Sequence, residues 1–303
     1  MSNGLAGLWP EIDKELTALG PDRLEPAVKL YRDIFSIWCC FQDRINYHGL
    51  SCPPEQVKPA LRQGKHLLGS RPLALERSLF REVLCKVAEK ATEYYPQARN
   101  FFNRLRLESG DSPELAMLFD QAAFLDRRRL QQYLWEQPWI GEAGLDPALI
   151  GHLIFIAAVP FYTKYAAMAV EQIDFSIWSE GYCPVCGQQP MMAKLRAEDG
   201  ARVLECGLCH AQWQFPRLEC PFCRNRGFQQ QQYFYTDEIP GRRMYLCECC
   251  KGYLKTTVVK EIGHKVILEI ENMFTLQLDS LARKEGYRPG EELVLLNLNR
   301  QGG

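Results

Sequence analysis

Cysteine is the residue whose spacing in this chain most directly predicts chemistry. Nine of the thirteen cysteines lie between Cys183 and Cys250, and eight of these form CxxC pairs. The two-residue gap lets a tight turn aim both sulfurs at one ion, and two such turns complete a tetrahedral shell of four thiolates. The four pairs are Cys183/Cys186, Cys206/Cys209, Cys220/Cys223 and Cys247/Cys250.

The intervals between the pairs indicate which pairs share an ion. Nineteen residues separate the first pair from the second, and twenty-three separate the third from the fourth. Each interval can hold a hairpin, so we predict two metal ions per chain, one on the first two pairs and one on the last two. A cross-brace, in which the first pair meets the third and the second meets the fourth, is also geometrically possible. The array is typical of two tandem rubredoxin-like or zinc-ribbon modules, whose small size makes the metal part of their folding energy.

The identity of the metal stays open at this point, because a tetrahedral thiolate shell suits both iron and zinc. Gly187 and Gly207 each directly follow a cysteine of the first module. They leave room for close contacts between backbone N–H groups and sulfur, which are typical of a rubredoxin knuckle. In the second module Arg224 and Lys251 follow the pairs instead. We therefore expect that module to lack these contacts, and to hold a different metal or to hold one less tightly.

Two further side chains in the cluster could be mistaken for cofactor ligands. His210 completes a CxxCH sequence, the pattern of c-type haem attachment, but that chemistry requires export, for which the N-terminus shows no signal. We interpret His210 as a residue at the surface or beside the thiolates. Cys249 lies inside the fourth pair, where its one-residue gap from Cys247 makes a poorer chelate than Cys247 with Cys250. We predict a spare thiol, with a redox or alternative-ligand role as the other possibility.

Charge and hydropathy exclude several classes of protein. The chain has 36 basic and 37 acidic residues and a net charge of −1, which argues against a general nucleic-acid binder. Met1–Leu16 has no continuous apolar run, so we expect a cytoplasmic protein. The one apolar stretch of membrane length, Leu149–Val170, is interrupted by His152, Pro160 and Lys164, which predicts a buried helix and no membrane insertion. The chain has no Ser/His/Asp constellation, phosphate loop or HExxH motif, so we expect a non-catalytic protein.

The elements that position the cysteines fall into two classes. Before about residue 175, apolar residues recur every three or four positions, which predicts several packed helices. After Ile173, short β-prone segments alternate with the cysteines, and the helical period returns from Val266 to Ala282 with Gly286 as a plausible C-cap. We expect this last helix to pack either on the helical domain or on the metal modules. The predicted fold class is α plus small β: a helical domain at 1–178, rubredoxin-like modules at 179–215 and 216–261, and a C-terminal helix and tail at 262–303.

The motifs of the C-terminal half also resemble a known family. The likeness is carried by residues 178–190, which read WSEGYCPVCGQQP, by Trp213, by the sequence Gly252-Tyr253-Leu254-Lys255 after the last pair, and by Asp279–Tyr287. The chain resembles formate dehydrogenase accessory proteins of the FdhE type, over its whole length but with specific motifs only in the C-terminal half. The resemblance implies a cytoplasmic assembly factor that contacts the catalytic subunit of a respiratory, exported formate dehydrogenase. It also implies iron in rubredoxin-like sites, with the eight paired cysteines as ligands.

Two other functions fit the same cysteines. A rubredoxin-like electron carrier or redox sensor would use the potential of the metal directly. A zinc-ribbon nucleic-acid binder fits the spacing but not the charge, because the basic runs are few beyond Arg127–Arg129. For the accessory role, we expect a client surface at the junction marked by Trp178 and Tyr182, because aromatic residues are favoured interface anchors. The alternative, which the sequence favours slightly for Trp178, is that both rings pack the domain junction. A homodimer is also possible.

Overall fold

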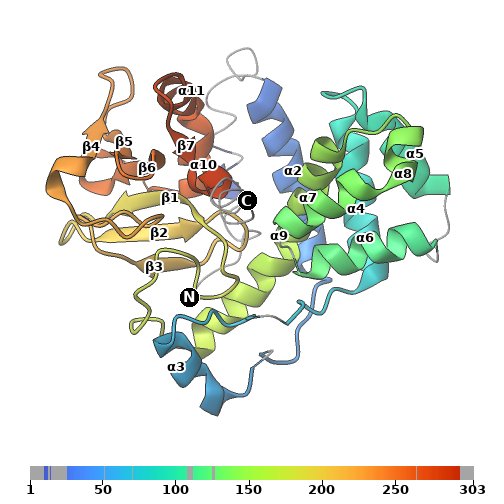
Figure 1. The fold of residues 1–303 in the computed structure, drawn as a ribbon, viewed down its shortest axis with the longest axis horizontal. Helices are drawn as coiled ribbons and strands as arrows, with labels where there is room; N and C mark the ends of the chain where they lie inside the picture. Colours follow the sequence, from blue (N-terminus) through green and yellow to red (C-terminus); the bar gives the residue numbers. More distant parts are fainter. Residues whose placement is uncertain are drawn as a thin grey trace. The chain divides into compact units, whose positions relative to one another are not determined.

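The computed structural model describes residues 10–12, 14, 26–50, 52–69, 71–107, 112–124, 127–263 and 265–293 (Figure 1). The chain forms two compact units that interleave in sequence. One, called here the helical unit, comprises Met1–Ser51 and Ser70–Ala167; the other, the sheet unit, comprises Cys52–Gly69 and Met168–Gly303. The predicted class is confirmed: helices come first, then a small sheet carrying two groups of four cysteines, then C-terminal helices. The segment 52–69 packs with the sheet unit, although it lies within the stretch expected to be helical domain.

Proline begins several of the helices. Pro54, Pro113 and Pro147 each occupy the first helical position, where the missing N–H is not needed and the fixed φ suits the helix. The helical unit contains α2 (Pro26–Gln42), α4 (Arg77–Ala91), α5 (Ala98–Leu107), α6 (Pro113–Phe124), α7 (Arg127–Glu136), α8 (Pro138–Glu142) and most of α9 (Pro147–Gln172).

Aromatic side chains from several helices contribute to the core of the helical unit. Phe80 of α4 is fully buried and makes edge-to-face contacts with Phe119 and Phe161, at centroid distances of 5.5 and 5.7 Å. The buried Trp38 of α2 donates its indole N–H to the carbonyl of Ile156 at 3.0 Å. Packing of this kind adds about 0.5–1.5 kcal/mol per aromatic pair beyond the burial of area.

Helix α9 is long and apolar enough to cross a membrane by length and composition. Within the structure, 78% of its most apolar window is buried, which agrees with the prediction of a buried helix. Such a helix is apolar on all sides because protein surrounds it.

The sheet unit holds one mixed sheet (Figure 1). The eight paired cysteines lie at the ends of its strands and in the turns beside them. Among the described residues the strand order is β3-β2-β1-β6-β5-β4, with the short β7 beside β6. The strands are β1 (Pro190–Leu195), β2 (Arg202–Cys206), β3 (Gln212–Gln214), β4 (Gln231–Phe234), β5 (Arg242–Cys247), β6 (Gly252–Val258) and β7 (Arg288–Pro289), and the helices are α3 (Pro54–Arg62), α10 (Leu268–Phe274) and α11 (Leu276–Lys284).

The two cysteine-bearing halves share this sheet. Strands β1 to β3 form an antiparallel set, and so do β4 to β6. The sets meet where β1 and β6 pair in parallel, from Met192 opposite Lys255 to Leu195 opposite Val258. The two modules are therefore joined by backbone hydrogen bonds between β1 and β6.

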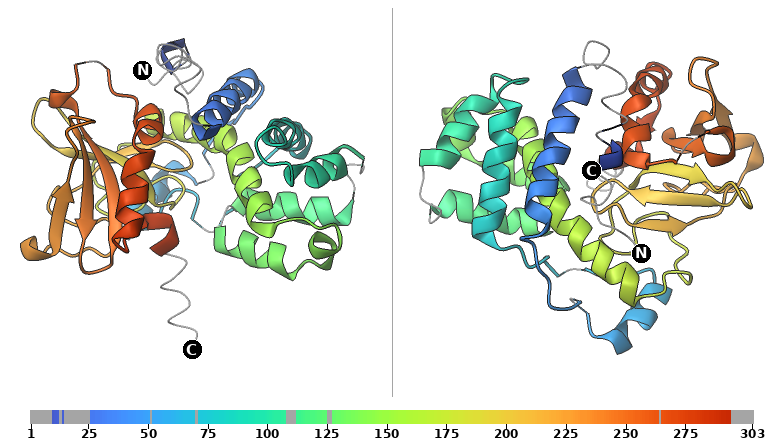
Figure 2. Two further views of the ribbon diagram at one scale, coloured as in Figure 1. Left: turned by 90° about the horizontal axis from the view of Figure 1, so that it is seen from above. Right: turned by 180° about the vertical axis from the view of Figure 1, so that it is seen from behind.

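The C-terminal helical segment is two helices rather than the single helix predicted over Val266–Ala282. The break falls at Thr275, whose hydroxyl donates to the carbonyl of Glu271 at 2.6 Å and competes with the helical ladder. Gly286 has φ of 82°, as its predicted capping role requires. Figure 2 shows α10 and α11 on one face of the sheet. There Leu278 and Ala282 of α11 pack with Met244, Leu246, Tyr253 and Tyr287. Helix α11 therefore packs on the metal modules, one of the two partners expected from the sequence.

Candidate metal centre

The eight paired cysteines lie in two groups of four, in sequential order. We call Cys183, Cys186, Cys206 and Cys209 the first cluster, and Cys220, Cys223, Cys247 and Cys250 the second cluster. In each cluster all four sulfurs lie within 4.8 Å of one another. The structure does not form the alternative cross-brace.

The spacing of the sulfurs fits a tetrahedral shell. In the first cluster Cys186 lies 3.4 Å from Cys206 and 3.6 Å from Cys209, measured between Sγ atoms. In the second cluster Cys220 and Cys250 are 3.7 Å apart, and Cys223 and Cys247 are 3.6 Å apart. A metal–sulfur bond of about 2.3 Å places sulfurs roughly 3.8 Å apart on a regular tetrahedron. Each cluster could therefore hold one metal ion with little movement, and the donor set suits zinc and iron alike.

All four CxxC turns follow the same backbone path. In the first three, the leading cysteine donates its N–H to the carbonyl five residues later at 2.9–3.0 Å, and in the fourth the same two positions pair across β5 and β6. The residue after each second cysteine has a positive φ. These residues are Gly187 (77°), His210 (55°), Arg224 (63°) and Lys251 (56°). Every turn is thus a knuckle of one geometry.

The prediction that the second module lacks the knuckle contacts is wrong. Arg224 and Lys251 adopt the left-handed backbone that Gly187 adopts, at an expected cost of about 1–2 kcal/mol each. Backbone N–H groups also reach sulfur in the second cluster, where they contribute to lowering the pKa of Cys220. Gly207 does not hold the left-handed position, because it follows the first cysteine of its pair. A difference in metal between the two modules stays a prediction.

The thiols of each cluster differ in acidity. A hydrogen bond from Cys250 lowers the pKa of Cys220 to about 5, whereas burial raises the pKa of Cys223 to about 12. In the first cluster burial opposes ionisation of Cys206, but hydrogen bonds from its three neighbours outweigh it and lower its pKa. Four thiolates repel one another in a buried volume, so a bound cation is what allows all four to ionise.

Cys249 points away from this arrangement. It is exposed, whereas its neighbour Cys247 is buried among the thiols of the second cluster. The position agrees with a spare thiol, and its dispensability for metal binding stays a prediction.

The first cluster is held by a segment that precedes it by more than a hundred residues. Leu67 and Leu68 donate backbone N–H groups to the carbonyls of Pro184 and Val185, inside the first CxxC turn, at 2.8 and 3.0 Å. The imidazole of His66 covers Gly187 so closely that a Cβ there would lie 2.7 Å from the ring. No ligand spacing in the sequence marks His66; only the fold brings it to the cluster.

Trp178 and Tyr182 do not form the exposed client surface that the sequence suggested. Trp178 is buried, donates its indole N–H to the carbonyl of Tyr182 and stacks edge-to-face on that ring. The hydroxyl of Tyr182 donates to the carbonyl of Gly64 at 2.5 Å. Both rings therefore stabilise the approach to the first CxxC turn.

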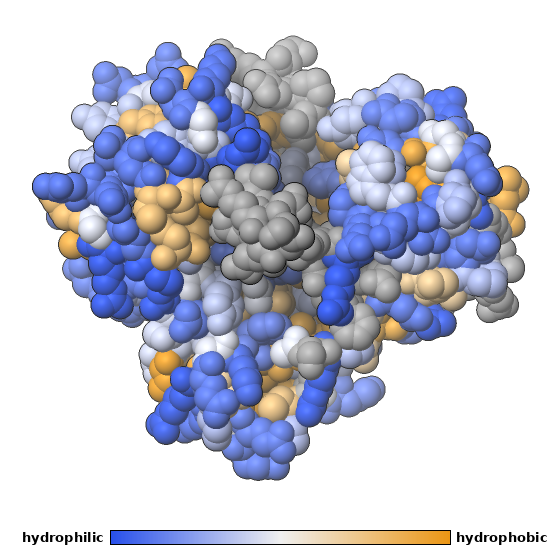
Figure 3. Space-filling view, in the orientation of Figure 1, coloured by the Kyte–Doolittle hydropathy of each residue, from blue (hydrophilic) through white to orange (hydrophobic). Residues whose placement is uncertain are grey.

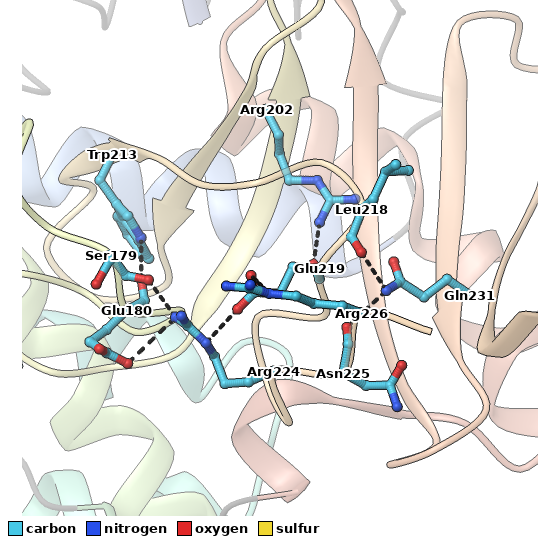
Figure 4. A network of polar contacts seen from close by, with 10 residues as sticks. All are labelled: Ser179, Glu180, Arg202, Trp213, Leu218, Glu219, Arg224, Asn225, Arg226 and Gln231. Atoms are coloured by element: carbon cyan, nitrogen blue, oxygen red, sulfur yellow. Dashed lines mark hydrogen bonds and ion pairs between the residues drawn. The ribbon is translucent and has the colours of Figure 1, made fainter. Parts of the chain in front are cut away.

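A network of charged groups connects the two clusters (Figure 4). Glu219, directly before Cys220, is buried and pairs with Arg224 at 2.5 Å and with Arg226 at 2.7 Å. Arg224 also donates to the carbonyl of Ser179, near the first CxxC turn. The buried Arg202 of β2 donates to the carbonyl of Glu219 at 3.0 Å. The third knuckle is therefore held against the residues that lead into the first.

His210 is buried rather than at the surface. Its Nδ1 lies 3.0 Å from a carboxylate oxygen of Glu269 in α10, and 3.7 Å from one of Glu205 in β2. Burial lowers the pKa of His210, but the two carboxylates outweigh it and raise the pKa to about 10. Burial and the charge of Glu269 raise the pKa of Glu205 to about 7. Residue spacing does not indicate this group, because Glu269 lies about sixty residues after Glu205 and His210 along the chain.

Comparison with known proteins finds similarity to one family. The family model described as "FdhE, central domain" matches residues 182–217, which contain the first cluster. The resemblance to the FdhE family is confirmed. An FdhE homolog of Aquifex aeolicus is 30% identical over 113 residues, covering 36% of this chain and 40% of the relative. One from Stutzerimonas stutzeri is 33% identical over 152 residues, covering 46% and 49%.

The shared fold extends further than the sequence likeness. The crystal structure of the FdhE protein from Pseudomonas aeruginosa matches with a TM-score of 0.59, covering 95% of this chain and 94% of that one at 19% identity. The alignments with the FdhE homologs span about half the length of those relatives or less. The fold is therefore shared with the Pseudomonas aeruginosa protein over nearly the whole chain, whereas the sequence likeness to the FdhE homologs covers a shorter part.

Proposed function

We propose that this chain is a cytoplasmic accessory protein that binds the catalytic subunit of a respiratory formate dehydrogenase during its maturation. The FdhE resemblance implies this role, and the construction of the two clusters supports it. Each cluster offers four thiolates, so a tetrahedral ion there has no open position for a substrate. Such an ion would supply folding energy to the knuckles, or transfer electrons, rather than activate a bound molecule.

The clusters would act by fixing the shape of the sheet unit. Cys183, Cys206 and Cys209 are buried, and the turns that carry them are joined to β1, β2 and the segment 64–68. Loss of an ion would therefore loosen surrounding backbone as well as the cluster itself.

A surface for the client lies near the second cluster, at the edge of the sheet. Phe228 and Tyr235 are 81% and 62% exposed, and they flank β4, whose outer edge pairs with no other described strand. Leu218 is also exposed, and its carbonyl accepts a hydrogen bond from Gln231 at the start of β4. Exposed aromatic residues beside an unpaired strand edge suit an extended segment of a partner protein. Hydrophilic residues cover much of the face shown in Figure 3, with apolar residues in smaller patches among them.

Co-purification with the formate dehydrogenase catalytic subunit tests the proposal. Wild-type protein, prepared under reducing and oxygen-free conditions, should retain the subunit. The double variant Phe228→Ser/Tyr235→Ser should weaken binding by at least about tenfold, the loss expected when interface anchors are removed. Trp135→Ser is the matched control, because Trp135 is a 68% exposed aromatic residue of the helical unit. This variant should bind the catalytic subunit as tightly as the wild type does. Failure of the wild type to bind would contradict the accessory role, whereas equal binding by both variants would contradict only the surface.

A second candidate function is redox sensing or electron transfer. It is favoured by the second cluster, in which Cys223 and Cys250 are only partly buried and Cys249 is exposed. Partial exposure allows electrons to reach an iron ion. Replacing iron by zinc separates the two functions: a scaffold binds the client in either form, and a redox sensor binds it only with iron.

A further inference from the structure

The group formed by Glu205, His210 and Glu269 is distinct from both cysteine clusters. One potential ligand atom from each residue lies within 4.8 Å of the other two. All three side chains are at least nine-tenths buried, with exposed fractions of 2%, 10% and 7%. They come from β2, from the second CxxC turn and from α10, so the fold assembles the group from three separate elements.

We propose that these three residues bind a third metal ion, a divalent first-row cation such as zinc or manganese. Ligands about 2.0–2.2 Å from one ion lie roughly 2.8–3.1 Å apart on an octahedral shell and roughly 3.3–3.6 Å apart on a tetrahedral one. The observed distances of 3.0 Å and 3.7 Å from His210 Nδ1 to the two carboxylates are close to these ranges. Two carboxylates with one imidazole form a mixed oxygen and nitrogen set that suits these cations.

The surroundings of Glu205 support a cation. Its Oε2 accepts a hydrogen bond from Gln212 at 2.6 Å, which fixes the orientation of the carboxylate. Its Oε1 is buried, accepts no hydrogen bond from the described residues and faces His210 beyond hydrogen-bond distance. A buried carboxylate oxygen without a donor is costly, and a bound cation would satisfy it. Two carboxylates and a neutral imidazole together carry two negative charges, which one divalent ion neutralises.

Manganese is the probe that separates this group from the thiolates, because Mn²⁺ prefers carboxylate ligands and thiolates select zinc or iron. Full-length protein with both cysteine clusters loaded is titrated with Mn²⁺, and the free ion is followed by electron paramagnetic resonance. We expect one equivalent to bind to the wild type. Glu205→Gln and Glu269→Gln should each weaken binding by at least about tenfold, and loss of the supporting amide in Gln212→Leu by about 10–100-fold.

The control is Glu198→Gln, because Glu198 is exposed on a turn and lies outside the group. It should bind like the wild type. Metal analysis of each variant, confirming two ions in the cysteine clusters, shows that the sheet unit has folded. Absence of Mn²⁺ binding by the folded wild type at millimolar concentration, together with no third equivalent in zinc-loaded protein, would overturn the proposal. So would equal binding by wild type, Glu205→Gln and Glu269→Gln.

Discussion

Replacing Gly181 by alanine should push apart the two chain segments that lead into the two cysteine clusters. A Cβ at this position would lie 1.9 Å from the carbonyl oxygen of Pro221 and 2.6 Å from its carbonyl carbon. Ordinary contact begins near 3.4 Å, so the two chain segments would have to move apart by about 1.5 Å. Pro221 cannot turn away, because it lies inside the third knuckle, closed by the hydrogen bond from Arg224 N–H to the carbonyl of Cys220 at 2.9 Å.

The size of the effect follows from this rigidity. Overpacking by one methyl group costs about 1–3 kcal/mol when neighbours can adjust. Here the neighbour is backbone, so we expect at least the upper value, about 3 kcal/mol. For a unit of this size that loss lowers the melting temperature by roughly 6–12 °C.

Calorimetric unfolding of metal-loaded protein measures the change, with Gly263→Ala as the control. Gly263 is exposed, and a Cβ added there would meet no atom within 4 Å, so its variant should stay within about 0.5 kcal/mol of the wild type. If Gly181→Ala melts like the wild type with both ions bound, the tight junction between the knuckles does not exist as described.

Three further predictions concern the knuckles. Cys183→Ser and Cys220→Ser should each lose about one metal equivalent and keep the other, as measured by elemental analysis; loss of both ions from either variant would show that the clusters do not bind independently. Cys249→Ser should keep both ions, and loss of the second ion would show that Cys249 is a ligand. Lys251→Gly should match or exceed wild-type stability by up to about 1 kcal/mol, whereas Lys251→Val should be destabilised, because a β-branched residue resists the left-handed backbone. If calorimetry gives the Lys251→Val and Lys251→Gly variants equal stability, the positive φ at this position is contradicted.

Residue spacing and periodicity predicted those parts of the fold that depend on residues close together in the chain. The CxxC spacing indicated four turns and their sequential grouping. The return of helical period near Val266 indicated C-terminal helices. It missed the break at Thr275, because a hydroxyl that bonds the preceding turn does not change the apolar pattern.

The features that the sequence pattern did not predict depend on contacts between residues far apart in the chain. The parallel pairing of β1 with β6 joins strands about sixty residues apart, and no periodicity marks it. The position of His66 over Gly187 likewise depends on the fold. Arg224 occupies a left-handed backbone position that normally favours glycine. Its side chain forms an ion pair with Glu219, which a glycine could not form. For Trp178 the sequence left two roles open, because aromatic residues serve both as interface anchors and as packed core residues. Its burial in the structure shows that it is packed.

The sequential pairing of the cysteines is tested most directly by anomalous diffraction from crystals of the metal-loaded chain. We predict one anomalous peak within the first cluster and a second within the second cluster, each surrounded by four sulfurs at about 2.3 Å. An ion that joins Cys183 to Cys220, or the absence of a peak from either cluster, would contradict the two-site arrangement.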